Sequence, residues 1–381
     1  MSTKKKLSAP VLYFGRIIGL IPFRLGEDQS DLQFSIAGAV YGTVLAIAYS
    51  IASAMALRLL FLNGFPLDTP LLVIASGMEM VCIYFLCVAI WLTFAYRQEH
   101  IIKMLRDFFK IHEIVWEYFE IPTDYERIIY QITVHATWIN VFLLILNIIA
   151  YSFFAGDRTY NVVIWISYCL PGVVYHNVII LFLVSMSAIR RKIRRLNEKL
   201  IERGRSINSS TSINDFAFVH GFLCDLAESV SHFFSHFILQ TVVQHLLLLL
   251  TRIYGICILL KNQKSSINIP LAMYVNVTDV IVCILQEYFI GSIVDGTVKE
   301  ARNTGNALHE MANKQRPLRQ RTQVYAFSIQ LLRRRLDLSA YGFFKFDLSL
   351  VSKVIGTATT YIVIVMQLEN FNPNVPSALP N

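Results

Sequence analysis

The last apolar segment of the chain carries polar side chains at a regular spacing. Lys353, Thr360 and Gln367 follow one another at intervals of seven residues, so on a helix they share one face, with Gly356 and Thr357 beside it. A helix that faces lipid has no use for such a stripe, because polar groups in hydrocarbon are costly. Two interpretations stay open. The stripe packs against other helices of the same bundle, or it faces water as one wall of a pore. The second requires several copies of the chain around an axis, since one helix cannot enclose a channel.

Charged residues also occur inside other apolar segments. Glu79, Arg252 and Asp279 each lie within a stretch long enough to cross a membrane, and Glu287 shares its stretch with Asp279. Ionisable groups at membrane depth are usually functional or paired with one another. We therefore expect Glu79, Arg252 and Asp279 either to serve a function or to be paired.

The sequence offers little to an enzyme or a metal centre. His232 and His236 lie one helical turn apart and could chelate a metal, but a site needs three or four ligands and no third is evident. We find no HExxH, GxSxG, Walker or GxGxxG motif. The six cysteines lie in apolar segments or in connections that we expect to be cytoplasmic, and are interpreted as small buried hydrophobes. We expect no enzymatic activity, no cofactor and no metal.

These side chains must be positioned by helices that cross a membrane. Of the 381 residues, 55% are hydrophobic and 16% are charged, whereas soluble domains carry about 25% charged residues. A bilayer is crossed by ~20 predominantly apolar residues. Seven segments are long enough, and some exceed bilayer thickness: residues 34–57, 69–96, 128–155, 159–189, 229–260, 265–294 and 348–368. The sequence predicts an all-α polytopic membrane protein with seven transmembrane helices.

Positive charge predicts the orientation of this bundle. Of the 34 Lys and Arg residues, 28 precede the first segment or lie between segments two and three, four and five, or six and seven, whereas 4 lie on the alternate side. Lys and Arg resist translocation, so we expect a cytoplasmic N-terminus and an extracellular C-terminus. A rhodopsin-like receptor has the opposite topology, and we find neither a DRY-type triplet nor NPxxY. The net charge of +8 follows from this bias and does not indicate nucleic-acid binding.

The connections on the cytoplasmic side are long and partly helical. Residues 101–119 are amphipathic, and residues 7–23 are typical of a short helix lying at the membrane face. Residues 298–341 favour a helix, a break at Pro317 and a second helix. No internal repeat is visible, which weighs against an inverted-repeat transporter.

The C-terminal segment resembles a known family. Residues 342–368, GFFKFDLSLVSKVIGTATTYIVIVMQL, are similar to the C-terminal signature of insect gustatory receptors, Thr-Tyr followed by five hydrophobic residues and Gln-Phe. Thr360, Tyr361 and Gln367 match this signature, and Leu368 replaces the final Phe. The aromatic pair and acid in GFFKFD and the N-terminal YFGRIIGLIPF also resemble this family, and the seven spans agree over essentially the whole chain.

The resemblance implies a tetrameric, ligand-gated, non-selective cation channel in the plasma membrane of sensory neurons. Four copies of the seventh helix would line the pore, with Gln367 and Leu368 at its extracellular constriction and Thr360, Tyr361 and Lys353 on the same helix. Leu368 would keep a hydrophobic ring of altered size. The implied partners are a small-molecule tastant, monovalent and divalent cations, membrane lipids, and further copies of this chain or other gustatory subunits, without nucleic acid.

The resemblance leaves the identity of the ligand and the class of receptor open. A bitter or aversive compound is favoured over sugar, because that subfamily is the most diverse, and carbon dioxide stays open. The chain could act as a homotetramer or in a heteromer. The competing classes are a metabotropic seven-helix receptor, a carrier, and an odorant receptor subunit of the same superfamily.

The resemblance also places a tastant pocket inside each subunit's bundle, towards the outer side. Such a pocket combines aromatic faces with a few hydrogen-bonding groups. For any single residue the competing interpretation is an interhelical hydrogen bond. The candidates are Glu79, Asn147, Tyr151, Trp165, Tyr168, His245, Arg252, Tyr274, Asn276 and Asp279.

We expect five regions along the chain. These are a cytoplasmic N-terminal segment (1–33), a six-helix ligand-sensing bundle with cytoplasmic extensions (34–294), cytoplasmic anchor helices (295–347), the pore-lining helix (348–368) and an extracellular tail (369–381).

Overall fold

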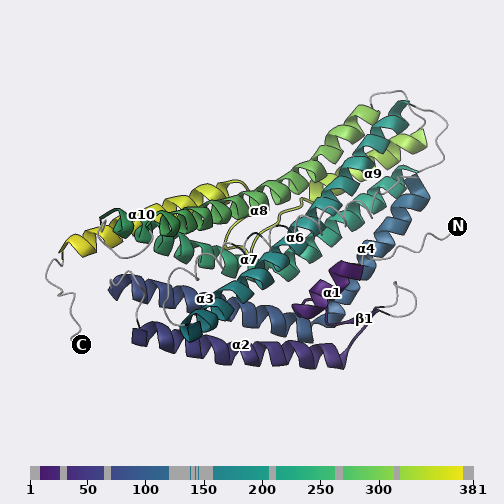
Figure 1. Ribbon diagram of the computed structural model, residues 1–381. Coiled ribbons are helices and arrows are strands. Elements are labelled where there is room, and N and C mark those ends of the chain that lie inside the picture. Colours follow the sequence, from purple (N-terminus) through teal and green to yellow (C-terminus); the bar gives the residue numbers. More distant parts are fainter. Residues whose placement is uncertain are drawn as a thin grey trace.

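The computed structural model describes residues 9–25, 32–63, 70–119, 158–205, 212–261, 269–312 and 318–371, together with Trp138, Phe142 and Ile145. Helices dominate the described residues, and a short antiparallel pair of strands joins the first two helices (Figure 1). The elements are α1 (Ala9–Ile17), β1 (Arg24–Leu25), β2 (Leu32–Gln33), α2 (Ile36–Asn63), α3 (Pro70–Tyr96), α4 (Gln98–Phe119), α6 (Arg158–Arg205), α7 (Ile213–Lys261), α8 (Ile269–Ala312), α9 (Leu318–Arg333) and α10 (Ser349–Phe371).

Six helices within the described ranges are long and apolar enough to cross a membrane. These stretches are Ile36–Leu59, Leu72–Tyr96, Leu170–Gly204, Ile213–Leu260, Ala272–Ala312 and Ser349–Gln367. They coincide with six of the predicted spans and confirm an all-α polytopic membrane protein. The predicted third span, 128–155, lies outside the described residues except for Trp138, Phe142 and Ile145, which are helical and exposed. The seven-helix count and the orientation of the termini stay predictions.

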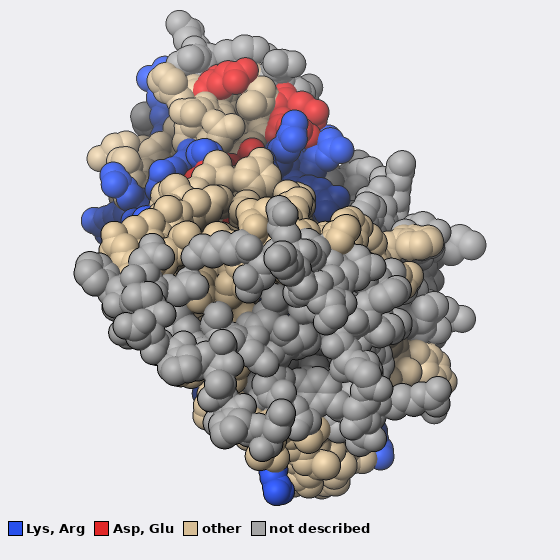
Figure 2. Space-filling view, turned by 60° about the vertical axis from the view of Figure 1, so that its left-hand side comes forward, with Lys and Arg blue, Asp and Glu red and all other residues tan. Residues whose placement is uncertain are grey.

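Three helices are much longer than a bilayer is thick. α6, α7 and α8 contain 48, 49 and 44 residues, so each is about 70 Å long at ~1.5 Å per residue, against ~30 Å of hydrocarbon. At one end of the molecule they run together with α4 and α9 (Figure 1). On the face seen in Figure 2, most of the visible Lys, Arg, Asp and Glu side chains gather at the upper end. α8 ends at Ala312 and α9 begins at Leu318, and the predicted break at Pro317 lies outside the described residues.

The core is organised around α7, which packs against α3, α4, α6, α8, α9 and α10. Aromatic side chains fill the space between these helices. Phe233 and Phe237 of α7 pack against Phe94 of α3, with ring centroids 5.8 and 6.0 Å from that of Phe94. Phe182 of α6 lies 5.7 Å from Phe234 and is fully buried. A helix that is apolar on nearly all sides is usually buried. α7 is such a helix, and it lies at the centre of the bundle.

A tight hairpin of chain leads into α10. The backbone N–H of Ala340 donates to the carbonyl of Phe344 at 3.0 Å, and that of Phe346 donates to the carbonyl of Leu338 at 3.1 Å. The Phe346 side chain is buried, with its ring centroid 5.9 Å from that of Phe182. The GFFKFD segment therefore fixes the first turn of α10 against the core.

Two further features hold the beginning of α10. Asp347 Oδ1 accepts hydrogen bonds from the backbone N–H and the hydroxyl of Ser349, at 3.0 and 2.5 Å, which satisfies an N–H group that the helix itself leaves unpaired. Gly291 of α8 lies so close that a Cβ at this position would be 2.6 Å from the carbonyl oxygen of Asp347. Only glycine lets α8 and the start of α10 approach this closely.

Candidate functional site

Charged side chains from three helices meet inside the bundle. Arg252 of α7 donates from Nε to Asp279 Oδ2 of α8 at 2.8 Å, and from Nη2 to Glu79 Oε1 of α3 at 3.3 Å. Thr251 Oγ1 donates to the other oxygen of Glu79 at 2.8 Å. Three of the residues predicted to bind ligand are thus one hydrogen-bonded cluster, which we call the arginine cluster (Glu79, Thr251, Arg252 and Asp279).

Burial explains why these charges are paired. The Glu79 side chain is 2% exposed, whereas Arg252 and Asp279 keep 21% and 26% of their side-chain surface. An unpaired charge at this depth is expensive, and attraction between close charges offsets the cost only when the remaining polar atoms are also bonded. Thr251 satisfies the second oxygen of Glu79. With all groups ionised, two carboxylates share one guanidinium, so the cluster carries one excess negative charge.

A second polar pair lies two helical turns away. His245 Nδ1 of α7 and Glu287 Oε1 of α8 are 2.6 Å apart, and both side chains are 1% exposed. His245 precedes Arg252 by seven residues, and Glu287 follows Asp279 by eight. Because α7 and α8 are antiparallel neighbours, the two pairs stack along their contact about 10 Å apart. The Tyr175 ring of α6 borders the second pair, 6.3 Å from the His245 ring.

Asn276 and Tyr274 stand apart from these contacts, whereas the side chains of the remaining predicted pocket residues lie outside the described part of the structure. Asn276 donates from Nδ2 to the carbonyl of Ala272 on its own helix, at 2.9 Å, and Tyr274 is 53% exposed. Trp165 and Tyr168 belong to α6. Asn147 and Tyr151 lie outside the described residues.

Sequence reasoning missed Thr251 and Tyr175, and it gave Glu287 no role in the pocket. The position of Glu287 follows only once one pair between α7 and α8 is known. On two consecutive antiparallel helices, residues that face each other have numbers with a nearly constant sum, so the pair Arg252 and Asp279 places His245 opposite Glu287.

The predicted pore residues whose side chains the structure describes lie on the uncovered face of α10. Leu350, Val354, Ala358 and Ile362 follow one another every four residues, are buried, and belong to the helix that packs on α7 and α8. The polar residues of the stripe, Lys353, Thr360 and Gln367, are exposed. Thr360 Oγ1 donates to the carbonyl of Gly356 at 2.9 Å, Tyr361 is 58% exposed, and Leu368 belongs to the last turns of α10.

Lys353 has no acidic partner among the described residues. Two carboxylates in this part of the chain, Asp347 and Glu287, are engaged elsewhere. Asp347 bonds Ser349 at the start of α10, and Glu287 is held by His245. The ammonium group therefore lies on the uncovered face with its charge uncompensated within the described part of the subunit.

Membrane-length helices around a buried polar cluster, with a polar face left open on α10, define a polytopic helical membrane protein. The sequence profile described as 7tm Chemosensory receptor matches residues 9–370. The chain belongs to this family of chemosensory receptors, as the C-terminal signature predicts.

Known relatives agree with this assignment. Over 162 residues the chain is 25% identical to the protein named gustatory receptor 28b in Drosophila melanogaster, covering 41% of this chain and 34% of the relative. A stretch of 45 residues is 47% identical to gustatory receptor 2a of the same organism, covering 12% and 10%. These matches span about a third or less of the length of the curated relatives.

Solved structures share the fold. The chain is similar to the insect olfactory receptor OR5 from Machilis hrabei, with a TM-score of 0.64 and 15% identity over 94% of this chain and 97% of that one. The structure of OR5 in complex with eugenol gives a TM-score of 0.63 and 14% identity. At this identity the likeness establishes the architecture.

Proposed function

We propose that the chain is a gustatory receptor that works as a tetrameric, ligand-gated, non-selective cation channel. A soluble tastant opens it, and we favour a bitter or aversive compound. It would reside in the plasma membrane of sensory neurons, as a homotetramer or together with other gustatory subunits. An odorant receptor subunit of the same superfamily is the alternative that shares this mechanism, and a metabotropic receptor is the one that does not.

The polar face of α10 carries this proposal. One side of the helix is occupied by its own bundle, and the other side carries Lys353, Thr360 and Gln367 without cover. The exposure of these side chains supports a pore over packing against the same bundle, the competing interpretation of the stripe. Water in a central pore formed by several copies would solvate them at less cost than lipid.

The ligand would bind beside the arginine cluster. Arg252 and Asp279 are partly exposed, so a polar ligand could exchange hydrogen bonds with them while Glu79 stays buried. OR5 has been solved with eugenol, a small molecule, and a pocket for a small molecule within this shared fold supports the proposal. The cluster's excess negative charge would favour ligands rich in hydrogen-bond donors.

Cysteine accessibility at position 367 tests the pore. Gln367→Cys is expected to react with a water-soluble, charged thiol reagent applied from outside, and modification should reduce the ligand-evoked current at least tenfold, because a bulky charge would occupy the constriction. Whole-cell recording before and after the reagent measures this.

Val354→Cys is the matched control, because its side chain is buried against the bundle on the opposite face of α10. It should not respond. Equal modification of both positions, or no effect at position 367, contradicts the pore assignment. A C-terminal epitope should also be accessible on intact cells, whereas a metabotropic receptor with an internal C-terminus would hide it.

Lys353→Gln is expected to raise inward cation current. An ammonium group from each copy, facing a common axis, repels cations, and the effect should be largest at low salt where screening is weak. Single-channel conductance measured over a range of ionic strengths tests this. Lys103→Gln, an exposed lysine of α4, should leave conductance unchanged. Unaltered conductance of Lys353→Gln at every ionic strength would place this side chain away from the permeation path.

A further inference from the structure

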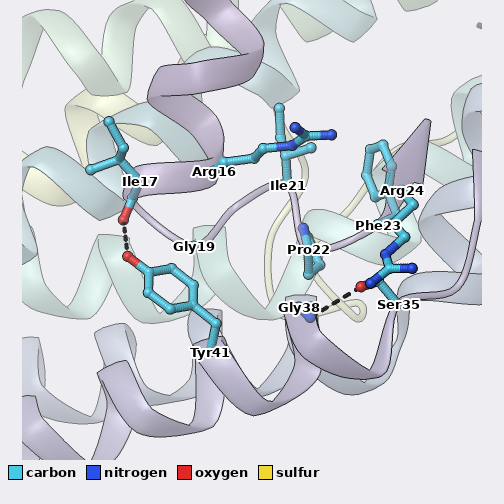
Figure 3. Close-up of a pocket in the computed structure, with 10 residues that line it drawn as sticks. All are labelled: Arg16, Ile17, Gly19, Ile21, Pro22, Phe23, Arg24, Ser35, Gly38 and Tyr41. Carbon is cyan, nitrogen blue, oxygen red and sulfur yellow. Dashed lines mark hydrogen bonds between the residues drawn. The ribbon is translucent and has the colours of Figure 1, made fainter.

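A cavity separate from the arginine cluster opens where α1 turns into α2. Its volume is about 470 Å³, and its walls come from the end of α1, the turn that follows, strand β1 and the first turn and a half of α2 (Figure 3). The polar side chains on its lining are Arg16, Arg24, Ser35 and Tyr41. Nothing in the proposed channel mechanism uses this cavity.

Hydrogen bonds hold the walls in place. Tyr41 donates its hydroxyl proton to the carbonyl of Ile17 at 2.8 Å, as Figure 3 shows, and Trp91 of α3 donates from Nε1 to the carbonyl of Ile18 at 2.9 Å. Gly38 lets α2 approach the turn, because a Cβ there would overlap the carbonyl oxygen of Pro22. The cavity is therefore a fixed feature of how α1 attaches to α2 and α3.

Two arginines border this cavity from different elements. Arg16 projects from the last turn of α1 and Arg24 from β1. Both side chains are exposed, and neither forms an ion pair within the described ranges. Guanidinium groups bind phosphate oxygens in a bidentate manner, more strongly than they bind neutral acceptors. The chemistry of the site fits a phosphate group.

Exposed apolar side chains surround the cavity. On α1, Tyr13 and Ile17 are 69% and 64% exposed although they are apolar, and at the beginning of α2 Ile36 is 74% exposed. Apolar side chains left open beside arginines are typical of a helix lying in the membrane interface. Exposed apolar side chains contribute nothing to the binding of a free phosphate ion, whereas they can contact the acyl chains of a lipid.

We propose that this cavity binds the phosphate of an anionic phospholipid, with Arg16 and Arg24 holding the headgroup and the exposed side chains of α1 contacting its acyl chains. The bound lipid would fix α1 to the membrane face beside the first span. The site requires that α2 crosses the membrane, and it is independent of which ligand opens the channel.

Native mass spectrometry of the full-length protein tests the site. The protein is purified in a neutral detergent and titrated with phosphatidylserine or phosphatidylcholine. Wild type is expected to retain phosphatidylserine, and Arg16→Gln combined with Arg24→Gln should bind it about 30-fold more weakly, since each arginine beside an anionic lipid adds roughly a factor of five. Phosphatidylcholine, which has no net charge, should bind wild type more weakly than phosphatidylserine does.

Matched variants and a competitor separate the possible outcomes. Arg191→Gln combined with Arg333→Gln removes the same charge from exposed positions outside the cavity and should bind phosphatidylserine like wild type. Equal loss in both double variants, or undiminished binding in the Arg16 and Arg24 variant, overturns the site. Displacement of the lipid by millimolar inorganic phosphate would assign the cavity to a free anion and overturn the lipid. A thermal melt of each variant verifies that it is folded.

Discussion

Replacing Arg252 by glutamine is expected to destabilise the protein by about 3 kcal/mol, because removing one partner of a buried ion pair leaves the other charge uncompensated. The larger effect falls on Glu79, whose side chain is 2% exposed and would be left as a buried carboxylate without a cation. Only its second oxygen would keep a hydrogen-bond partner, Thr251. Breaking a buried ion pair usually costs about 3–5 kcal/mol of stability. We expect the low end of this range because 21% of the Arg252 side chain is exposed. Thermal unfolding in detergent and the amount of receptor at the cell surface measure the loss.

Removing the charges that Arg252 compensates separates the loss of the ion pair from local disruption. Arg252→Gln combined with Glu79→Gln and Asp279→Asn leaves neutral groups of similar shape, and most of the stability should return.

The same variants also report on ligand binding. In cells, Asp279→Asn alone should shift the ligand concentration for half-activation and leave ion permeability ratios unchanged. A stable Arg252→Gln protein with normal ligand response would show that the cluster has neither role.

Gly291→Ala is expected to abolish most of the ligand-evoked current even though the change adds one methyl group. The new Cβ would lie 2.6 Å from the carbonyl oxygen of Asp347 and 3.3 Å from the Cα of Leu348, so the first turn of α10 must move away from α8. Overpacking of this kind costs about 1–3 kcal/mol. The displaced helix is the one proposed to line the pore, so current normalised to surface receptor should fall at least tenfold.

Gly305→Ala on the same helix is the matched control. Apart from its own helix turn, a Cβ at position 305 meets no atom of the described residues within 4 Å, and alanine favours a helix over glycine by about 1 kcal/mol. This variant should be as stable as wild type or more so, with normal current. Equal behaviour of the two alanine variants would mean that the contact between α8 and the start of α10 does not govern the channel.

The helices that could cross a membrane were predicted because each has a local cause. Hydropathy locates the apolar helices, and α8 ends and α9 begins on either side of the predicted break at Pro317. The polar stripe of α10 could be assigned to one face from its spacing alone, although spacing did not decide what that face meets. The buried stripe of Leu350, Val354, Ala358 and Ile362 now shows which side the bundle covers.

The partners of the buried charges could not be predicted in the same way. Glu79 and Arg252 are 173 positions apart, and their contact depends on how α3 and α7 are rotated and shifted against each other. No local pattern encodes these quantities. For the same reason the sequence named no partner for Glu287, which the register of α7 against α8 places beside His245. An isolated polar residue in a span predicts that a partner exists without naming it.

The open face of α10 also bears on how the receptor is made in the cell. In the tetramer that we propose, a newly synthesised copy would present Lys353, Thr360 and Gln367 to hydrocarbon until it meets others, and charged or polar groups at that depth are costly. Such orphan copies are natural targets for retention and degradation in the endoplasmic reticulum. The amount of receptor delivered to the cell surface would then rise steeply with the rate of synthesis. A truncated copy that keeps the bundle but lacks α10 would not be retained or degraded for this reason.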